Sequence, residues 1–306
     1  MIKIKEEYRI KTWLIVLKNA FSNLFSKDPL ILGGATAFFT IFALPPIILI
    51  IVQAFGLVLQ PSVIRQEIFT KLNNMFGQDT TQQIIDTLAA VRKIGESTTV
   101  IILGSLFLVF VATNLFNVIK LSLNKLWSVR PKNKTGWKRD LKSRMLSIIL
   151  IIAAGLLLVV GLVGQSIQVL LGEKVAAFIP FLSFYFKGAI HYLFSILINT
   201  AWFIIVFRYL ADVRPSWRSI LPGAVFTSVL FNLGKIILHA LLVNSNLNTL
   251  YGASASIVLL LLFVFYTSLI LYLGASFVIA WNNYFGHRVP TVPYAEFYIT
   301  VEKDTE

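Results

Sequence analysis

The sequence predicts an all-α membrane protein: a polytopic helix bundle of about six transmembrane helices. Of its 306 residues, 57% are hydrophobic and only 13% are charged, whereas charged residues make up about a quarter of a soluble globular protein. The apolar residues come in blocks of about twenty or more, which is the length that a helix needs to cross the hydrocarbon. The chain has no cysteine, so disulfides and thiolate metal sites are excluded.

Six apolar blocks are long enough to span a bilayer. They cover residues 30–59, 98–119, 145–171, 188–210, 220–243 and 254–281. The first block contains Pro45 and Pro46. Each proline removes a backbone donor and collides with the preceding turn, so we expect a kink there. A kink that serves only packing and a break that forms a binding site both stay open.

Two further helices are predicted outside the spans. Residues 1–29 form a cytoplasmic amphipathic N-terminal helix, because apolar residues recur at helical spacing with lysines between them. These apolar residues are Trp13, Leu14, Leu17, Phe21, Leu24 and Phe25. Between the first two blocks, Ile84, Leu88 and Val91 form a second apolar stripe, which predicts an extracytoplasmic helix.

The distribution of positive charge predicts the orientation. Residues 1–29 hold six basic side chains, and residues 120–144 hold nine against the single acid Asp140. Both segments, and therefore both termini, are expected in the cytoplasm, on either side of a six-span domain over residues 30–281. Residues 282–306 are polar and contain prolines, so we expect a flexible cytoplasmic tail.

The basic loop 120–144 is expected to bind anionic lipid headgroups, since each basic residue near a membrane surface contributes about 1 kcal/mol. We expect no nucleic-acid partner, because this loop adjoins the membrane. Whether the chain forms a homo-oligomer stays open. The small residues of YGASAS, where the last block begins, suit either a dimer contact or packing within one chain.

The fifth block carries a stripe of polar residues. At 100° per residue, four of them fall within about 60° of one another around the helix: Ser228, Asn232, Lys235 and His239. A charged lysine that faces lipid at this depth costs at least about 2.5–3.5 kcal/mol. We therefore expect Lys235 to face the interior of the bundle or a wet cavity.

Amides on other blocks complete the predicted polar cavity: Asn114 and Asn117 on the second block and Asn199 on the fourth. No carboxylate lies within any of the six blocks. Three states of Lys235 therefore stay open: a neutral amine, an ammonium bonded to amide and backbone oxygens, or an ammonium that meets an arriving anion. A proton-linked role of Lys235 with His239 is a further alternative.

Four segments of the chain carry a family resemblance. They are GGATAFFTIFALPPIILIIV, LSLNKLWSVRPKNKTGWKRDLKSR, FRYLADVRPSWRSILPGAVF and YGASASIVLLLLFVFYTSLILYLGASFVIAW. They resemble the YihY/BrkB family of bacterial inner-membrane proteins, once called ribonuclease BN. The resemblance implies a multi-pass inner-membrane protein linked to the cell envelope and virulence, and it implies no mechanism. The family usually has a glutamate where this chain has Ser276, so no role of that carboxylate is expected here.

We expect no enzyme activity, no cofactor and no metal site. A metal-dependent nuclease needs clustered His, Asp or Glu, whereas His191, His239 and His287 lie far apart in the sequence. The leading hypothesis is a transporter or lipid-handling protein whose polar cavity takes an anionic headgroup or a small anion. The alternative is a non-transporting membrane scaffold or envelope-integrity factor, in which the polar stripe serves only helix packing.

Overall fold

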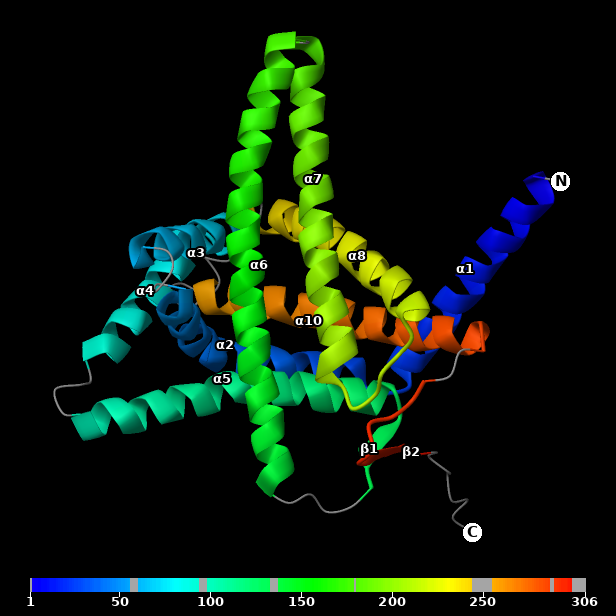
Figure 1. Cartoon of the computed structure of the whole chain (residues 1–306), viewed down its shortest axis with the longest axis horizontal. Helices are drawn as coiled ribbons and strands as arrows, with labels where there is room; N and C mark the ends of the chain where they lie inside the picture. Colours follow the sequence, from blue (N-terminus) through cyan, green and yellow to red (C-terminus); the bar gives the residue numbers. More distant parts are fainter. Residues whose placement is uncertain are drawn as a thin grey trace.

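The computed structural model describes residues 2–55, 60–93, 98–132, 137–178, 180–243, 255–286 and 289–298. Among them, six helices each contain a stretch long and apolar enough to cross a membrane. These helices are α2 (Pro29–Phe55), α5 (Thr98–Leu126), α6 (Trp137–Phe178), α7 (Pro180–Ile205), α8 (Trp217–Val243) and α10 (Ala255–Tyr284). The predicted all-α bundle with six spans is therefore confirmed (Figure 1).

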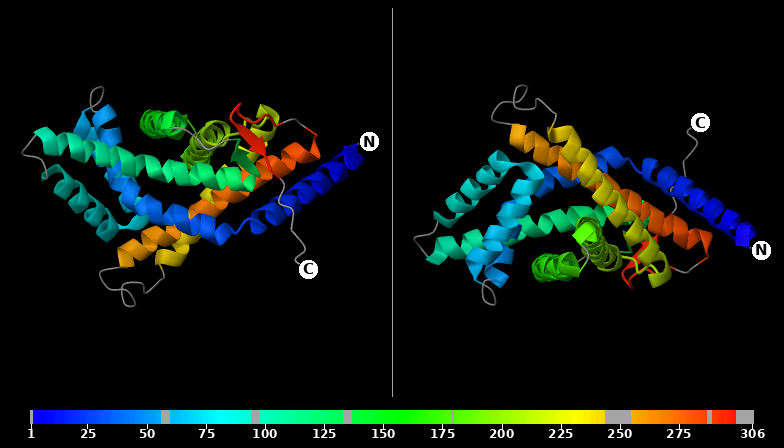
Figure 2. Two further views of the ribbon diagram at one scale, coloured as in Figure 1. Left: turned by 90° about the horizontal axis from the view of Figure 1, so that it is seen from below. Right: turned by 90° about the horizontal axis from the view of Figure 1, so that it is seen from above.

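Helix α10 has the most neighbours in the bundle. It packs against α2, α5 and α8, and α2 in turn packs against α5. Helices α6 and α7 form an antiparallel hairpin that projects beyond the other helices (Figure 1) and is seen nearly end-on when the molecule is turned (Figure 2). The hairpin therefore runs across the other helices, and it joins them mainly through the contacts of α6 with α5 and of α7 with α8.

Helix α6 is much longer than one membrane crossing. Its 42 residues extend about 60 Å at 1.5 Å per residue, about twice the thickness of the hydrocarbon. Among the residues that were described with their side chains, the apolar stretch covers Leu141–Gly164. The segment between the third and fourth predicted spans is largely helical: α6 continues to Phe178 and α7 begins at Pro180. The fixed φ of proline suits a first helical position.

Helix α1 (Ile2–Phe25) is present as predicted, but it buries a different face. It packs against α10, with Val16 and Ala20 fully buried. Trp13 stacks on Phe277 with 5.5 Å between the ring centroids. Four residues of the predicted apolar stripe are exposed instead: Trp13, Leu14, Phe21 and Phe25. The small side chain of Ala20 favours this arrangement, because it lets the two helices approach closely.

The segment between the first two spans forms two helices rather than the single one expected. They are α3 (Pro61–Phe76) and α4 (Gln78–Lys93). Gly77 separates them with a φ of 81°, a conformation that glycine adopts without a steric cost. Ile84 and Leu88 of the predicted stripe are buried, whereas the side chain of Val91 lies outside the described residues.

The basic loop expected at 120–144 is mostly helical. Helix α5 continues to Leu126, so Lys120 lies on a helix rather than in a loop, and α6 begins at Trp137. Helix α5 begins at Thr98, where the second block was predicted to begin, and it continues beyond residue 119 to Leu126.

Part of the predicted flexible tail is folded. Helix α10 extends to Tyr284, and strand β2 (Ala295–Phe297) pairs antiparallel with β1 (Val129–Pro131). The Arg130 guanidinium lies 3.0 Å from the Glu296 carboxylate across this pair. Val213 and Thr291 form an additional isolated bridge. The expectation of flexibility is therefore wrong for residues 289–298.

Pro45 and Pro46 both lie inside α2, and the helix is continuous through them. The two prolines therefore do not end the span. The kink expected at this point stays a prediction.

Candidate functional site

Polar residues of the predicted stripe meet helix α7 at its contact with α8. Ser228 and Asn232 of α8 are buried. The Ser228 hydroxyl donates to the carbonyl of Ile196 at 2.8 Å. The Ser195 hydroxyl donates to Oδ1 of Asn232 at 2.9 Å. The stripe therefore faces the bundle, and it faces α7 in particular.

Lys235 lies at the edge of this cluster, half-buried. Its Nζ is 3.5 Å from Ser195 Oγ and 5.3 Å from the centroid of the Phe231 ring. Asn199 Nδ2 also lies 3.5 Å from Ser195 Oγ. Within the described part of the chain, no carboxylate forms an ion pair with Lys235. The lysine thus has one weak hydroxyl contact and one aromatic contact.

Ser195 connects the cluster, and the sequence analysis did not single it out. Its hydroxyl touches Asn232, Lys235 and Asn199. The available signal was its position four residues before Asn199, which puts both side chains on one face of α7. The side chain of His239 lies outside the described residues.

The two asparagines predicted on the second span do not join this cluster. Asn114 lines a mainly apolar cavity of about 490 Å³ between α2, α4, α5 and α10, which Pro45 and Pro46 also line. Asn117 is exposed. The amides expected to surround one cavity therefore lie in separate places.

A second polar site, which the sequence analysis missed, lies where α5 meets the segment after α7. Lys120 Nζ is 2.9 Å from Asp212 Oδ1, and the two side chains are only 6% and 2% exposed. Asn124, one turn further along α5, donates from Nδ2 to Asp212 Oδ2 at 2.9 Å and accepts the Asp212 backbone N–H at 2.9 Å. Asp212 is thus held by a cation and an amide from the same helix.

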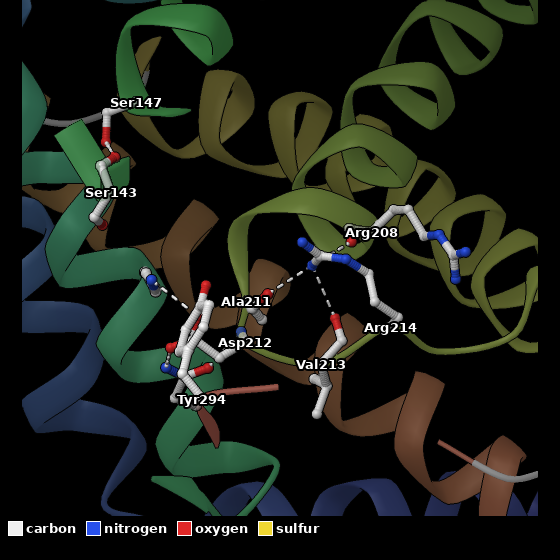
Figure 3. Close-up of polar contacts among 10 residues, drawn as sticks. Ser143, Ser147, Arg208, Ala211, Asp212, Val213, Arg214 and Tyr294 are labelled. Atoms are coloured by element: carbon white, nitrogen blue, oxygen red, sulfur yellow. Dashed lines mark hydrogen bonds and ion pairs between the residues drawn. The ribbon is translucent and has the colours of Figure 1, made fainter. Parts of the chain in front are cut away.

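Residues on both sides of Asp212 fix its position. A π-helix, η1 (Val206–Leu210), precedes it, and π-helical turns are rare and frequent at functional sites. Arg214 Nη1 donates to the carbonyls of Ala211 at 2.9 Å and Val213 at 3.1 Å, and Figure 3 shows both bonds. The Arg214 guanidinium therefore holds the backbone around Asp212 in place by hydrogen bonds to the carbonyls on either side of it.

The tail completes this site. The Tyr294 hydroxyl donates to Asp212 Oδ1 at 3.2 Å, and the Val292 N–H donates to the Asp212 carbonyl at 3.0 Å. Beside the ion pair lies a cavity of about 270 Å³, lined by side chains from α5, α6, η1 and the tail. Lys142 and Arg214 are among them.

Tyr294→Phe is expected to lower the free energy of unfolding by about 1.5 kcal/mol, the lower end of the range for hydrogen bonds to charged groups, because it removes the 3.2 Å bond to the buried Asp212 carboxylate. Unfolding of the purified protein in detergent, titrated with sodium dodecyl sulfate, measures this loss. Tyr298→Phe is the matched control, since its ring lies near Lys27 and not near Asp212. Equal midpoints for the two variants would mean that the Tyr294 hydroxyl contributes nothing.

Ser276, the position discussed for the family resemblance, is fully buried in α10. Its hydroxyl accepts a hydrogen bond from Asn23 of α1 at 3.3 Å. Next to it, the Trp127 indole donates to the carbonyl of Ala275 at 2.9 Å. Ser276 therefore takes part in fastening α1 to α10, and it lies apart from both polar sites.

Six membrane-length apolar helices, carrying polar side chains where they meet one another, define a multi-pass integral membrane protein. Residues 20–295 match the family model of Virulence factor BrkB. The chain therefore belongs to this family, as the sequence resemblance indicated. No curated protein and no solved structure matches the chain.

Proposed function

We propose that this chain is a transporter or lipid-handling protein of the bacterial inner membrane. In this proposal both termini are cytoplasmic, and the polar cluster of α7 and α8 binds an anionic headgroup or a small anion. Lys235 supplies the positive charge that attracts the ligand, while Ser195, Asn199 and Asn232 supply hydroxyl and amide groups around it.

The proposal rests on the lack of a counter-ion for Lys235 within the described residues. A lysine inside a span is costly unless it has partners or reaches water, and buried charges in proteins are normally paired. Lys235 has no carboxylate partner among the described residues, whereas the buried Lys120 of α5 is paired with Asp212. An anionic ligand would provide the missing counter-charge.

One observation favours the rival function, a non-transporting scaffold or envelope-integrity factor. Ser195 and Ser228 already link α7 and α8 through bonds of 2.9 and 2.8 Å. Interhelical bonds of this kind stabilise helix packing in membranes without any ligand. The two functions therefore differ in whether Lys235 has a ligand, and not in the helix packing.

Lys235→Met is expected to remove a bound anionic lipid or small anion that the wild-type protein retains in mild detergent. Native mass spectrometry of the two proteins measures this loss. One charge-assisted hydrogen bond corresponds to about a tenfold change in affinity, so occupancy should fall clearly at limiting ligand. Gel filtration checks that the variant is folded.

Lys125→Met is the matched control, because Lys125 forms an exposed ion pair with Asp28. It should retain the same ligands as the wild type. If Lys235→Met and Lys125→Met keep identical ligands, Lys235 serves only packing, and the scaffold function replaces the proposal.

A further inference from the structure

We propose that an anionic phospholipid binds at the second site, near the Lys120–Asp212 pair. Its phosphate would occupy the cavity between α6, η1 and the tail, and one acyl chain would lie along α6. The site uses none of the residues around Lys235, so it stands independently of the function proposed above.

The charges that line the cavity favour an anion. Lys120, Lys142 and Arg214 are cationic, and Asp212 is the only carboxylate among the lining residues that the structure describes. Lys120 and Asp212 neutralise one another at 2.9 Å. Two cations, on α6 and on the segment after η1, therefore remain without a counter-charge at the cavity.

Both of these cations have N–H groups that form no hydrogen bond within the described residues. Lys142 is exposed, forms no ion pair within the described residues, and lies 5.9 Å from the centroid of the Tyr294 ring. The three hydrogen bonds of Arg214 all use Nη1. Its Nη2 and Nε bond to no group in the described part of the chain, and a planar guanidinium edge suits two phosphate oxygens.

The wall that α6 gives to this cavity also carries exposed apolar side chains. Met145 and Ile149 line it, yet they are 52% and 57% exposed. They follow Lys142 at intervals of three and four residues, so all three side chains share one face of α6. The exposed apolar face continues along the span through Ile152, Leu156 and Val160.

A cationic cavity followed by a lipid-facing apolar stripe matches the two halves of a phospholipid. The phosphate pairs with Lys142 and Arg214, and the acyl chain covers the stripe that begins at Met145. A free phosphate would pair with the cations alone, whereas a phospholipid would contact both the cations and the adjoining stripe. The geometry therefore favours a lipid over a soluble anion.

The test uses the purified full chain with equal amounts of phosphatidylglycerol and phosphatidylcholine, read by native mass spectrometry. The wild type should retain phosphatidylglycerol in preference to phosphatidylcholine, and Lys142→Ala should lower that retention about tenfold. Lys142 is exposed, so its replacement should leave the fold intact. Lys132→Ala is the matched control, since Lys132 is also exposed but does not line the cavity.

Three results would overturn the proposal. They are equal retention by Lys142→Ala and Lys132→Ala, no preference for phosphatidylglycerol, and displacement of the lipid by millimolar inorganic phosphate, which would indicate a site for a soluble anion. Lys235→Met in the same experiment distinguishes the two sites. This variant should keep the lipid that Lys142→Ala loses. A negative result for one proposed site therefore leaves the test of the other site unaffected.

Discussion

Asp212→Ala is expected to lower the free energy of unfolding by about 3–5 kcal/mol, because it leaves a buried charge without its partner. Lys120 is only 6% exposed, and in the variant it would have no carboxylate beside it. Asn124 would also lose the acceptor of its 2.9 Å hydrogen bond. Detergent unfolding with sodium dodecyl sulfate measures the loss, which should appear as a much earlier transition and a lower yield of folded protein.

The double variant Lys120→Met/Asp212→Asn is expected to recover most of this stability. It removes both charges together, and replacing a whole buried ion pair is often neutral. Lys125→Met is the control on the same helix, since its pair with Asp28 is exposed and such pairs contribute about 1 kcal/mol or less. If Asp212→Ala unfolded at the same point as Lys125→Met, the buried pair would have no structural importance.

Gly274→Ala is expected to destabilise the protein at the upper end of the range of about 1–3 kcal/mol that overpacking costs. A Cβ at this position would lie 1.9 Å from Oγ1 of Thr227 on α8. Thr227 is fully buried, and its hydroxyl donates to the Gly223 carbonyl at 2.6 Å, so it has little room to move. The contact between α8 and α10 must therefore widen. The unfolding titration described for Asp212→Ala measures the effect.

Gly34→Ala is the matched control for this prediction. A Cβ there would have nothing within 4 Å, and alanine is favoured over glycine by up to about 1 kcal/mol inside a helix. The control should therefore be as stable as the wild type or more stable. Adding Thr227→Ala to Gly274→Ala should restore part of the loss. Equal unfolding of Gly274→Ala and Gly34→Ala would show that the helices separate without cost.

The spans were predictable because each depends on a local property, a run of apolar residues long enough for the hydrocarbon. The direction in which the stripe of α8 faces was predictable for a similar reason: one helical period places Ser228, Asn232 and Lys235 on one side, and lipid excludes a charge. The contact with Ser195 was not predictable, because it depends on how α7 is rotated against α8.

The second site was not predicted, because basic residues next to an apolar block indicate a loop at the membrane surface. Lys120 is basic and precedes a basic stretch, so it was assigned to the loop, although a carboxylate 92 positions later in the sequence neutralises it inside the fold. Asp212 lies beyond the fourth apolar block, so it was not considered as a partner. Pairing between such distant residues follows from tertiary structure and leaves no local pattern.

The strand pair joins residues 129–131 to residues 295–297, so it forms only after nearly the whole chain has been synthesised. Chains fold progressively as they are made, beginning with their N-terminal parts. Lys120 and Asp212 are both translated before Tyr294. A nascent chain therefore holds both members of the ion pair before the tyrosine that completes the site is made. Insertion of the spans and completion of this site are separate steps, and a chain that stops short of residue 294 would carry an unfinished site for quality-control proteases to detect.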